Sequence, residues 1–199
     1  MKNLHFARSL GLVCIVGAAV QIIYGLLSIP FPFYDPNTYY GWDEALWAVA
    51  TIGMIGGALG LLALDAGRPR WLAAIGAALS VLGNLMRIVA AVLHITAPAN
   101  ADSYVPLILI SILLMVLGMG MLGVSTLLGR QLRGWHAWMP LLAGACPLVI
   151  LPTFSINLPL HFILLGLWGI PWLLVGYVVF SLATKQEPTV LGKAPAVVR

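Results

Sequence analysis

The chain has 199 residues, of which 61% are hydrophobic and 8% are charged. Soluble domains carry about 25% charged residues, so this composition excludes a soluble enzyme or a soluble binding domain. The mean hydropathy is +1.02, and apolar residues are spread along the whole chain, which predicts a polytopic membrane protein. In such a protein the placement of the charges matters more than their sum of +4, and we expect no nucleic-acid partner.

Sequence motifs that would identify a cofactor or a reaction are scarce. The chain has no CxxC, HExxH, GxxxxGK or GxSxG pattern, which removes the usual signals of zinc, nucleotide and hydrolase sites. Its two cysteines, Cys14 and Cys146, lie within apolar runs and lack metal-ligand spacing. We therefore expect no cofactor and no metal ion.

Long apolar runs predict an all-α bundle of six transmembrane helices. Roughly 20 apolar residues cross a hydrocarbon core of about 30 Å. The predicted spans are residues 9–29, 45–65, 71–95, 104–128, 136–155 and 160–183. We expect residues 1–185 to form a single six-helix transmembrane domain. Residues 186–199 contain prolines and no apolar periodicity, and they are predicted to form a flexible cytoplasmic tail.

The first and fifth segments depart from a simple apolar run. The first follows basic residues and could also be read as a cleaved signal peptide. Its apolar run continues to Ile29, which is span length, so we interpret it as an uncleaved helix. The fifth contains Pro140, Pro147 and Pro152, and proline inside a span kinks the helix. We expect this helix to be bent.

Charges between the spans predict the orientation of the bundle, because short basic loops stay on the cytoplasmic side of a membrane. Nine of the ten basic residues fall at the chain ends or in the second and fourth connections: Lys2, Arg8, Arg68, Arg70, Arg130, Arg133, Lys185, Lys193 and Arg199. The opposite connections have no Lys or Arg and carry the acids Asp35, Asp43, Glu44 and Asp102. Both termini are therefore predicted to be cytoplasmic.

Tryptophans mark both membrane interfaces in this arrangement. Trp71, Trp135 and Trp138 lie beside predicted inner helix ends, and Trp42 and Trp47 lie beside an outer one. Aromatic residues at such positions form belts that hold helices at the headgroup level. We expect these five side chains to face the interfaces.

Arg87 is the only basic residue well inside a predicted span. Counted from Trp71 at about 1.5 Å per residue, its Cα lies roughly 24 Å from the inner boundary and some 6 Å short of the outer one. A charge in a span costs about 2.5–3.5 kcal/mol on insertion scales and is a functional candidate by default. Because side chains lean toward the helix N-terminus, which points inward here, we favour a buried partner over snorkelling.

Polar residues on other spans fall at the same outer half of the bundle. At 100° per residue, the third span has one polar stripe that contains Asn84, Arg87 and His94. Other polar or aromatic candidates lie on the first, second and sixth spans. The candidate ligand-binding residues are Arg87, Asn84, Gln21, Tyr24, Glu44, Asp43, His94, His161 and Trp168.

Arg87 has three open interpretations. It can form a fixed ion pair with Glu44 or Asp43, it can hold a carboxylate, phosphate or lipid headgroup in a pocket, or it can snorkel to the interface. Asn84 can be an interhelical hydrogen bond rather than a ligand-binding group. The two histidines can simply be solvated, and Trp168 can serve helix packing.

Small residues on the second span predict close helix packing. Gly53 with Gly57, and Gly56 with Gly60, form two overlapping GxxxG pairs. Their partner can be the first span, the third span or a second copy of the chain, and we favour packing within the chain. An oligomer or a partner membrane protein stays an alternative.

Two stretches carry a resemblance to known proteins. The third span contains Asn-Leu-Met-Arg-Ile-Val-Ala-Ala-Val-Leu at 84–93, and Leu-Pro-Leu at 158–160 leads through Leu-Trp at 167–168 to Gly-Tyr at 176–177. These patterns resemble a broad group of bacterial six-span membrane proteins called a domain of unknown function. The chain departs from the group at Ala90, where an acidic residue is usual. The resemblance implies a six-helix bundle in a bacterial inner membrane and no catalytic residues.

These features favour a protein that binds, and in one version transports, a small amphipathic or lipid-like ligand in an outward-facing pocket around Arg87. Besides this ligand, we expect membrane lipids as partners. A second class is a membrane-embedded enzyme that uses Glu44, Asp43 or His161 as an acid or base toward a lipidic substrate. A third class is a non-catalytic membrane subunit or sensor in which Arg87 is structural.

Overall fold

The computed structural model describes residues 4–33, 41–97, 101–130, 132 and 134–191, and this part of the chain is almost entirely helical. The elements are α1 (Leu4–Leu27), α2 (Trp42–Ala63), α3 (Arg70–Thr96), α4 (Ala101–Gly129), the 3-10 helix η2 (Gly134–Ala137), α5 (Met139–Ile150), α6 (Thr153–Ile156), α7 (Leu158–Leu167) and α8 (Gly169–Leu191). They provide six helical segments that are long and apolar enough to cross a membrane, which confirms the predicted all-α class and the predicted number of span-length apolar helices.

The fifth and sixth segments are interrupted helices. The fifth consists of α5 and α6, which are separated at Leu151 and Pro152, within the segment whose prolines predicted a bend. The sixth consists of α7 and α8, which are separated at Trp168, and this interruption was not predicted. Pro171 lacks an amide hydrogen, so the Leu167 carbonyl has no donor four residues later. Gly169, another weak helix former, follows Trp168 directly.

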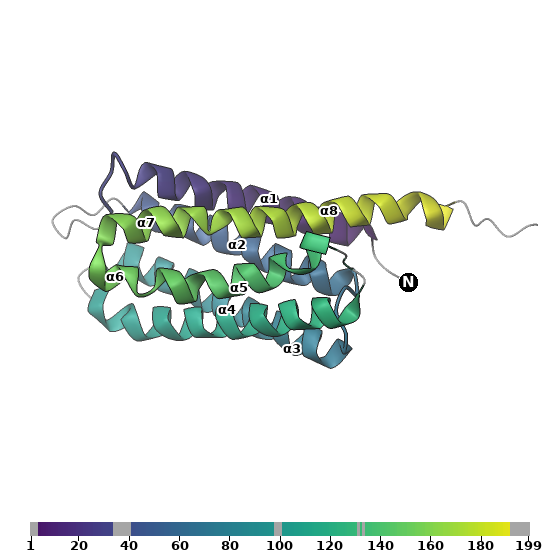
Figure 1. Ribbon diagram of the computed structural model, residues 1–199. Helices are drawn as coiled ribbons and strands as arrows, with labels where there is room; N and C mark the ends of the chain where they lie inside the picture. Colours follow the sequence, from purple (N-terminus) through teal and green to yellow (C-terminus); the bar gives the residue numbers. More distant parts are fainter. Residues whose placement is uncertain (1–3, 34–40, 98–100, 131, 133, 192–199) are drawn as a thin grey trace, which may run out of the picture.

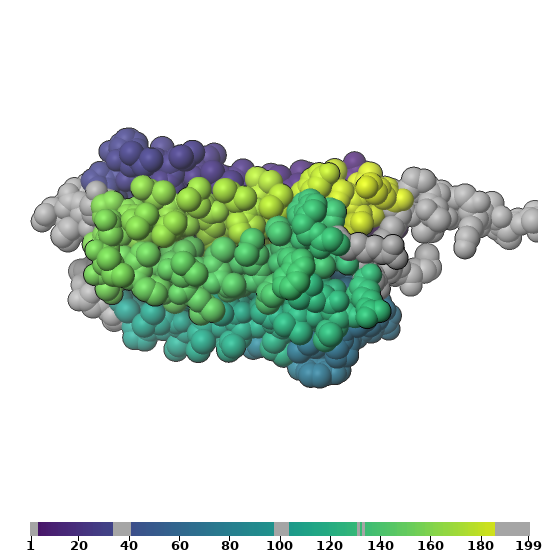
Figure 2. All heavy atoms as spheres, in the orientation of Figure 1, coloured from purple at the N-terminus to yellow at the C-terminus, as the bar shows by residue number. Residues whose placement is uncertain are grey.

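The six segments lie lengthwise beside one another (Figure 1), and their contacts connect them into a closed ring. Each of the helices α1 to α5 packs against the next in the chain, and α8 closes the ring by packing against both α1 and α5. Helix α7 continues the contact with α1 at the other end of the sixth segment. Figure 2 shows one side of this ring, which is covered by α5, α7 and α8.

The centre of the ring is filled differently in its two halves. In the half that contains the chain ends, α2 and α8 meet across the middle. A Cβ atom at Gly57 would lie 3.1 Å from the Trp172 ring, and one at Gly60 would lie 2.7 Å from Val179. These glycines let α8 approach α2 closely. A cavity lies in the opposite half of the ring.

The GxxxG glycines of α2 pack within the chain, as we favoured. A Cβ at Gly53 would lie 2.5 Å from the Cα of Gly17 on α1, so the two backbones touch. Gly56 also faces α1, at the Leu10 carbonyl. The partners of this surface are therefore α1 and α8, and α3 is not among them.

A run of glycines in α4 also serves helix packing. Residues 118–123 have the spacing G-x-G-x-x-G, which binds dinucleotides only where it follows a strand and opens a helix. Here it lies inside an apolar helix. Gly118 faces the backbone of Ser80 on α3, and Gly123 faces Leu141 on α5. The run is thus a contact surface between three neighbouring helices.

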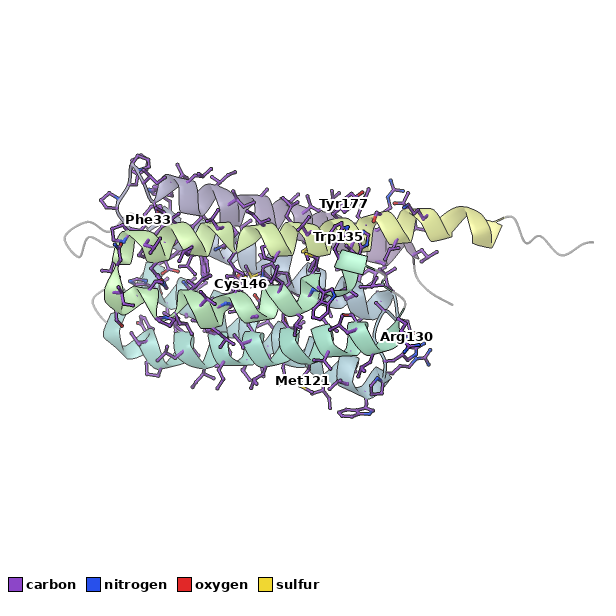
Figure 3. The ribbon with its side chains drawn as sticks, viewed as in Figure 1. Phe33, Met121, Arg130, Trp135, Cys146 and Tyr177 are labelled. Atoms are coloured by element: carbon purple, nitrogen blue, oxygen red, sulfur yellow. The ribbon has the colours of Figure 1, made fainter. Side chains whose placement is uncertain are left out.

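The two ends of the bundle differ in charge. Arg68 and Arg130 lie at the end where the described chain begins and ends, as Figure 3 shows for Arg130, and Phe33 lies at the opposite end. Five residues on which the predicted orientation also depends lie outside the described part: Lys2, Asp35, Arg133, Lys193 and Arg199. Helix α8 continues to Leu191, into the segment predicted as a tail, and residues 192–199 lie outside the described part.

The turn between α2 and α3 is held by an ionic cluster. Asp65 accepts hydrogen bonds from Arg68 Nη1 and Arg70 Nη2, both at 2.8 Å. The amide of Arg68 donates to the Ser125 carbonyl at 2.7 Å, which ties the turn to α4. The hydrogen bonds from Arg68 and then Arg70 hold the pKa of the Asp65 carboxyl well below its usual range. The cluster keeps a net positive charge at this end of the bundle.

Candidate functional site

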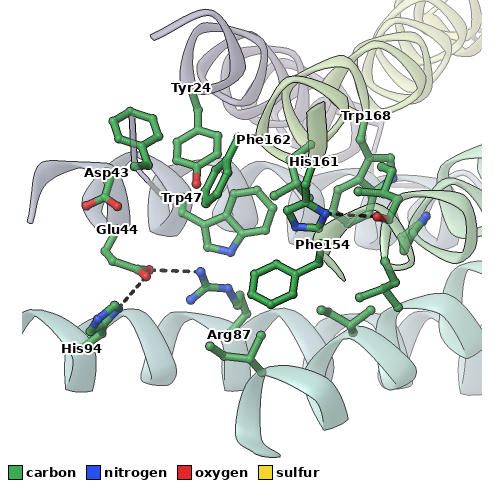
Figure 4. Close-up of a pocket in the computed structure, with 17 residues that line it drawn as sticks. Tyr24, Asp43, Glu44, Trp47, Arg87, His94, Phe154, His161, Phe162 and Trp168 are labelled. Atoms are coloured by element: carbon green, nitrogen blue, oxygen red, sulfur yellow. Dashed lines mark hydrogen bonds and ion pairs between the residues drawn. The ribbon is translucent and has the colours of Figure 1, made fainter. Parts of the chain in front are cut away.

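A cavity of about 260 Å³ lies inside the ring, in the half away from the chain ends (Figure 4). All six spanning segments contribute to its wall. It is lined by Tyr24, Phe33, Asp43, Glu44, Trp47, Arg87, His94, Ile108, Ile112, Pro147, Ile150, Leu151, Phe154, His161, Phe162, Leu165 and Trp168. The charged side chains come from α2 and α3, and the rest of the wall is mostly aromatic or aliphatic.

Arg87 forms a buried ionic cluster with two other residues. Its Nη2 lies 3.1 Å from Glu44 Oε2, and Nδ1 of His94 lies 2.8 Å from Glu44 Oε1 (Figure 4). The side chains of Arg87 and Glu44 are each 10% exposed, and that of His94 is 30% exposed. Glu44 lies in the first turn of α2, whereas Arg87 and His94 lie two turns apart on α3. The cluster therefore joins these two helices at the edge of the cavity.

The arginine also stacks on the ring of Trp47, which the sequence analysis predicted to lie at the outer membrane interface. The Cζ atom of Arg87 lies 5.1 Å from the centroid of Trp47, a cation–π distance. Trp47 is only 5% exposed, so its predicted place in the outer aromatic belt is wrong. It follows Glu44 by three residues on α2, and this spacing places both side chains on the face that meets Arg87.

Two hydrogen-bond donors of this cluster are unused. Nη1 of Arg87 and Nε1 of Trp47 are buried, and neither has a hydrogen-bond partner in the described part of the chain. Oδ1 of Asp43, which also belongs to a cavity-lining residue, is an acceptor in the same state. Buried polar groups without partners are costly and occur at few positions in a protein. The cavity wall therefore offers two unused donors and one unused acceptor to the polar group of a ligand.

Aromatic rings form the wall beside the ionic cluster. Tyr24 is the centre of this group, with ring centroids 5.1 Å from Phe33, 5.4 Å from Trp47 and 6.2 Å from Phe162. Offset and edge-to-face contacts at such distances stabilise aromatic clusters. The rings bring α1, α2 and α7 together and give the cavity a rigid apolar side.

Trp168 supplies a hydrogen bond that the backbone of α5 lacks. Pro147 has no amide hydrogen, so the carbonyl of Ala143 loses its helical donor. The indole Nε1 of Trp168 donates to that carbonyl at 2.7 Å. This contact joins the two interrupted segments, and it explains why a polar-edged tryptophan lies so deep in the bundle. The Trp168 ring also contributes to the floor of the cavity.

His161 also bonds to a backbone carbonyl, at the break between α5 and α6. At the start of α6, the amide of Phe154 bonds to Leu151 rather than to Ile150, and the Ile150 carbonyl instead accepts a hydrogen bond from Thr153 Oγ1. Nδ1 of His161 lies 3.1 Å from that carbonyl and 3.1 Å from Thr153 Oγ1. A carbonyl only accepts hydrogen bonds, which assigns the proton to Nδ1. His161 is therefore buried and bonded, and it is not simply solvated as in one of our interpretations.

The cavity brings together seven of the nine predicted residues: Tyr24, Asp43, Glu44, Arg87, His94, His161 and Trp168. Gln21 and Asn84 are fully buried but do not line it. Gln21 donates to the Leu165 carbonyl at 2.8 Å. Asn84 donates to the Ser80 carbonyl at 2.8 Å. This bond lies within α3 and is not the interhelical bond that we considered for Asn84.

For Arg87, the structure combines two interpretations that the sequence left as alternatives. The guanidinium is ion-paired with Glu44, and it also borders a cavity that contains Tyr24 and Trp168. It is 9% exposed and bonded inside the ring, which excludes snorkelling in this conformation.

Comparisons with known proteins place the chain in no family: no family model matches it, and no curated protein or solved structure matches it significantly.

Proposed function

We propose that this chain is a multi-pass membrane protein that binds a small amphipathic or lipid-like ligand in the cavity around Arg87. The observation that carries the proposal is the composition of the wall. One side holds the Arg87–Glu44–His94 cluster, and the other is formed by aromatic and aliphatic side chains. Ligand sites are typically apolar cavities with a few placed polar groups, and such a wall fits a molecule with a polar head and an apolar body.

The head of the ligand would meet the two unused donors. Arg87 Nη1 and Trp47 Nε1 belong to side chains in contact with each other, so an acceptor group of the ligand head would find both donors in the same part of the wall. A carboxylate or phosphate oxygen has this chemistry, and charge-assisted bonds to a guanidinium are the strongest of their type. Glu44 already balances the charge of Arg87, which favours a head with little net charge or one that also offers a cation to Asp43.

We further propose that the protein lies in a bacterial inner membrane with both termini in the cytoplasm. The described basic residues Arg68, Arg70 and Arg130 at one end of the bundle support this orientation by the positive-inside rule. The exposed Trp71, Trp135 and Trp138 at the same end fit an interfacial belt. The cavity would then lie in the outer half of the membrane.

Native mass spectrometry of the protein, extracted from its membrane in a mild detergent, tests the binding proposal. We expect one adduct per chain whose mass is not that of the detergent. Leu165 lines the cavity, so Leu165→Trp should fill it and remove at least about nine-tenths of the adduct, equivalent to about 1.4 kcal/mol.

The matched control is Leu167→Trp. Leu167 lies two residues away on α7, is 49% exposed and does not line the cavity, so its variant should keep the adduct. An adduct of equal abundance in both variants would contradict binding inside the cavity.

A further inference from the structure

One side of the cavity wall reaches the outer surface of the bundle. Phe154 on α6 lines the cavity and is nevertheless 57% exposed. Across from it, Ile108 and Ile112 on α4 line the same cavity and are half-buried. Phe154 therefore connects the cavity wall to the surface of the bundle, and its neighbours in the wall are apolar. This side, between α4 and α6, is where we infer that the cavity opens.

The opening follows from the break in the fifth segment. Helix α6 has four residues and lies between Pro152 and the extended residue Asn157. It packs against α7 and α5, whereas α4 packs mainly against α3 and α5 and more weakly against η2. The contact of the fifth segment with α4 is thus made mainly by α5, which ends at Ile150. A four-residue helix covers less of this side of the ring than a continuous helix would.

The opening lies at the depth of lipid acyl chains. Ile108 and Ile112 follow the start of α4 by seven and eleven residues, which is about 10 and 16 Å along the helix. Helix α4 has 29 residues and is about 13 Å longer than a hydrocarbon core of about 30 Å, so Ile112 falls within that core, and Ile108 does so when the helix is centred on the bilayer. Their neighbours Leu109 and Leu113 are 53% and 57% exposed. A molecule that passes between α4 and α6 therefore comes from the bilayer.

We propose that an acyl chain of a membrane amphiphile enters the cavity sideways between α4 and α6, with its polar head at the Arg87 cluster. This proposal rests on the proposed function and specifies its ligand class and its route. The cavity of about 260 Å³ is below the roughly 300–1,000 Å³ of sites that enclose a whole small-molecule ligand. Only part of the amphiphile fits inside, and the opening lets the rest of the chain remain in lipid.

Quenching of tryptophan fluorescence by brominated lipid tests the route. The full-length protein is placed in nanodiscs of phosphatidylcholine with dibrominated acyl chains, and its emission is compared with that in ordinary phosphatidylcholine. Two of its seven tryptophans, Trp47 and Trp168, line the cavity. A brominated chain inside the cavity should quench these two in addition to the tryptophans at the bundle surface.

Two double variants isolate the cavity contribution without changing the number of tryptophans. Ile108→Phe with Ile112→Phe narrows the opening and should reduce the quenching by up to two sevenths of the total emission. Leu109→Phe with Leu113→Phe adds the same side chains on the lipid-facing side, and it should quench like the wild type. Phe154→Ala, which widens the opening, should increase the quenching and serves if the narrowing variant fails to fold.

A water-soluble probe separates failure of the route from failure of the function. The probe is 8-bromooctanoate, added to protein in ordinary phosphatidylcholine nanodiscs. Equal quenching of all variants by brominated lipid, together with quenching of the wild type by 8-bromooctanoate, would overturn sideways access and leave the binding proposal standing. If neither reagent reached the cavity tryptophans, both proposals would be overturned.

Discussion

Replacing Arg87 with methionine is expected to lower the free energy of unfolding by about 3–5 kcal/mol, the usual cost of removing one partner of a buried ion pair. The substitution leaves the Glu44 carboxylate inside the ring with His94 as its remaining partner of the cluster. It also removes the cation from the Trp47 ring. Chemical denaturation in mixed micelles, followed by helical circular dichroism, measures the change.

The double variant Arg87→Met with Glu44→Gln separates the structural role of the pair from its role in binding. Because it leaves no unpaired charge in the cluster, most of the lost stability should return, as for other buried pairs that are replaced together. Binding should not return, because the guanidinium that would hold the ligand head is still missing. A double variant as unstable as Arg87→Met, or one that retains the native ligand, would contradict this division.

The second large effect is expected at the contact between α1 and α2. Gly53→Val would place side-chain atoms against the backbone of Gly17, where a Cβ already lies 2.5 Å from the Cα. Overpacking usually costs about 1–3 kcal/mol, and this site belongs at the upper end because two backbones would have to separate. We expect a fall of about 3 kcal/mol in the free energy of unfolding and a loss of monodisperse protein in size-exclusion chromatography.

Gly120→Val is the matched control for this substitution. Gly120 also lies inside a spanning helix, but a Cβ there would meet nothing within 4 Å. Valine has a better helix propensity than glycine by a few tenths of a kcal/mol, so the control should be as stable as the wild type or slightly more so. Equal destabilisation by both variants would show that close packing of α1 on α2 is not the cause.

The sequence predicted the spans because their signal is local. Runs of apolar residues and the prolines that interrupt them determine where each helix lies, and Pro140, Pro147 and Pro152 were sufficient to single out the fifth segment, which the structure divides into α5 and α6. The interruption of the sixth segment was missed, although Pro171 carries the same signal. An apolar run contains little information about which helices become neighbours, so the partners of the α2 glycines had to come from the structure.

The candidate site was predicted in part, through its ionisable residues. A charge in an apolar span is conspicuous, and Arg87 led to Glu44 or Asp43 as alternative partners, of which the structure pairs it with Glu44. Apart from Tyr24 and Trp168, the aromatic and aliphatic wall was missed, because Phe154 or Ile108 looks like any other apolar residue of a membrane protein. Trp47 could have been found, since it follows Glu44 on the same helix face.

Gln21 and Asn84 show the limit of reading polar residues in spans. Both side chains donate to backbone carbonyls, of Leu165 and Ser80 respectively. Residues that bond to the backbone and residues that face a cavity have the same appearance in a sequence. Only the positions of neighbouring helices distinguish the two roles.

An experimental density map of the protein in lipid nanodiscs tests the central claim most directly. We predict elongated density inside the ring, with one end within hydrogen-bond distance of Arg87 Nη1 or Trp47 Nε1 and the other passing Phe154 between α4 and α6. A cavity closed by side chains, or an Arg87 side chain turned outward to the acyl chains, would contradict the account.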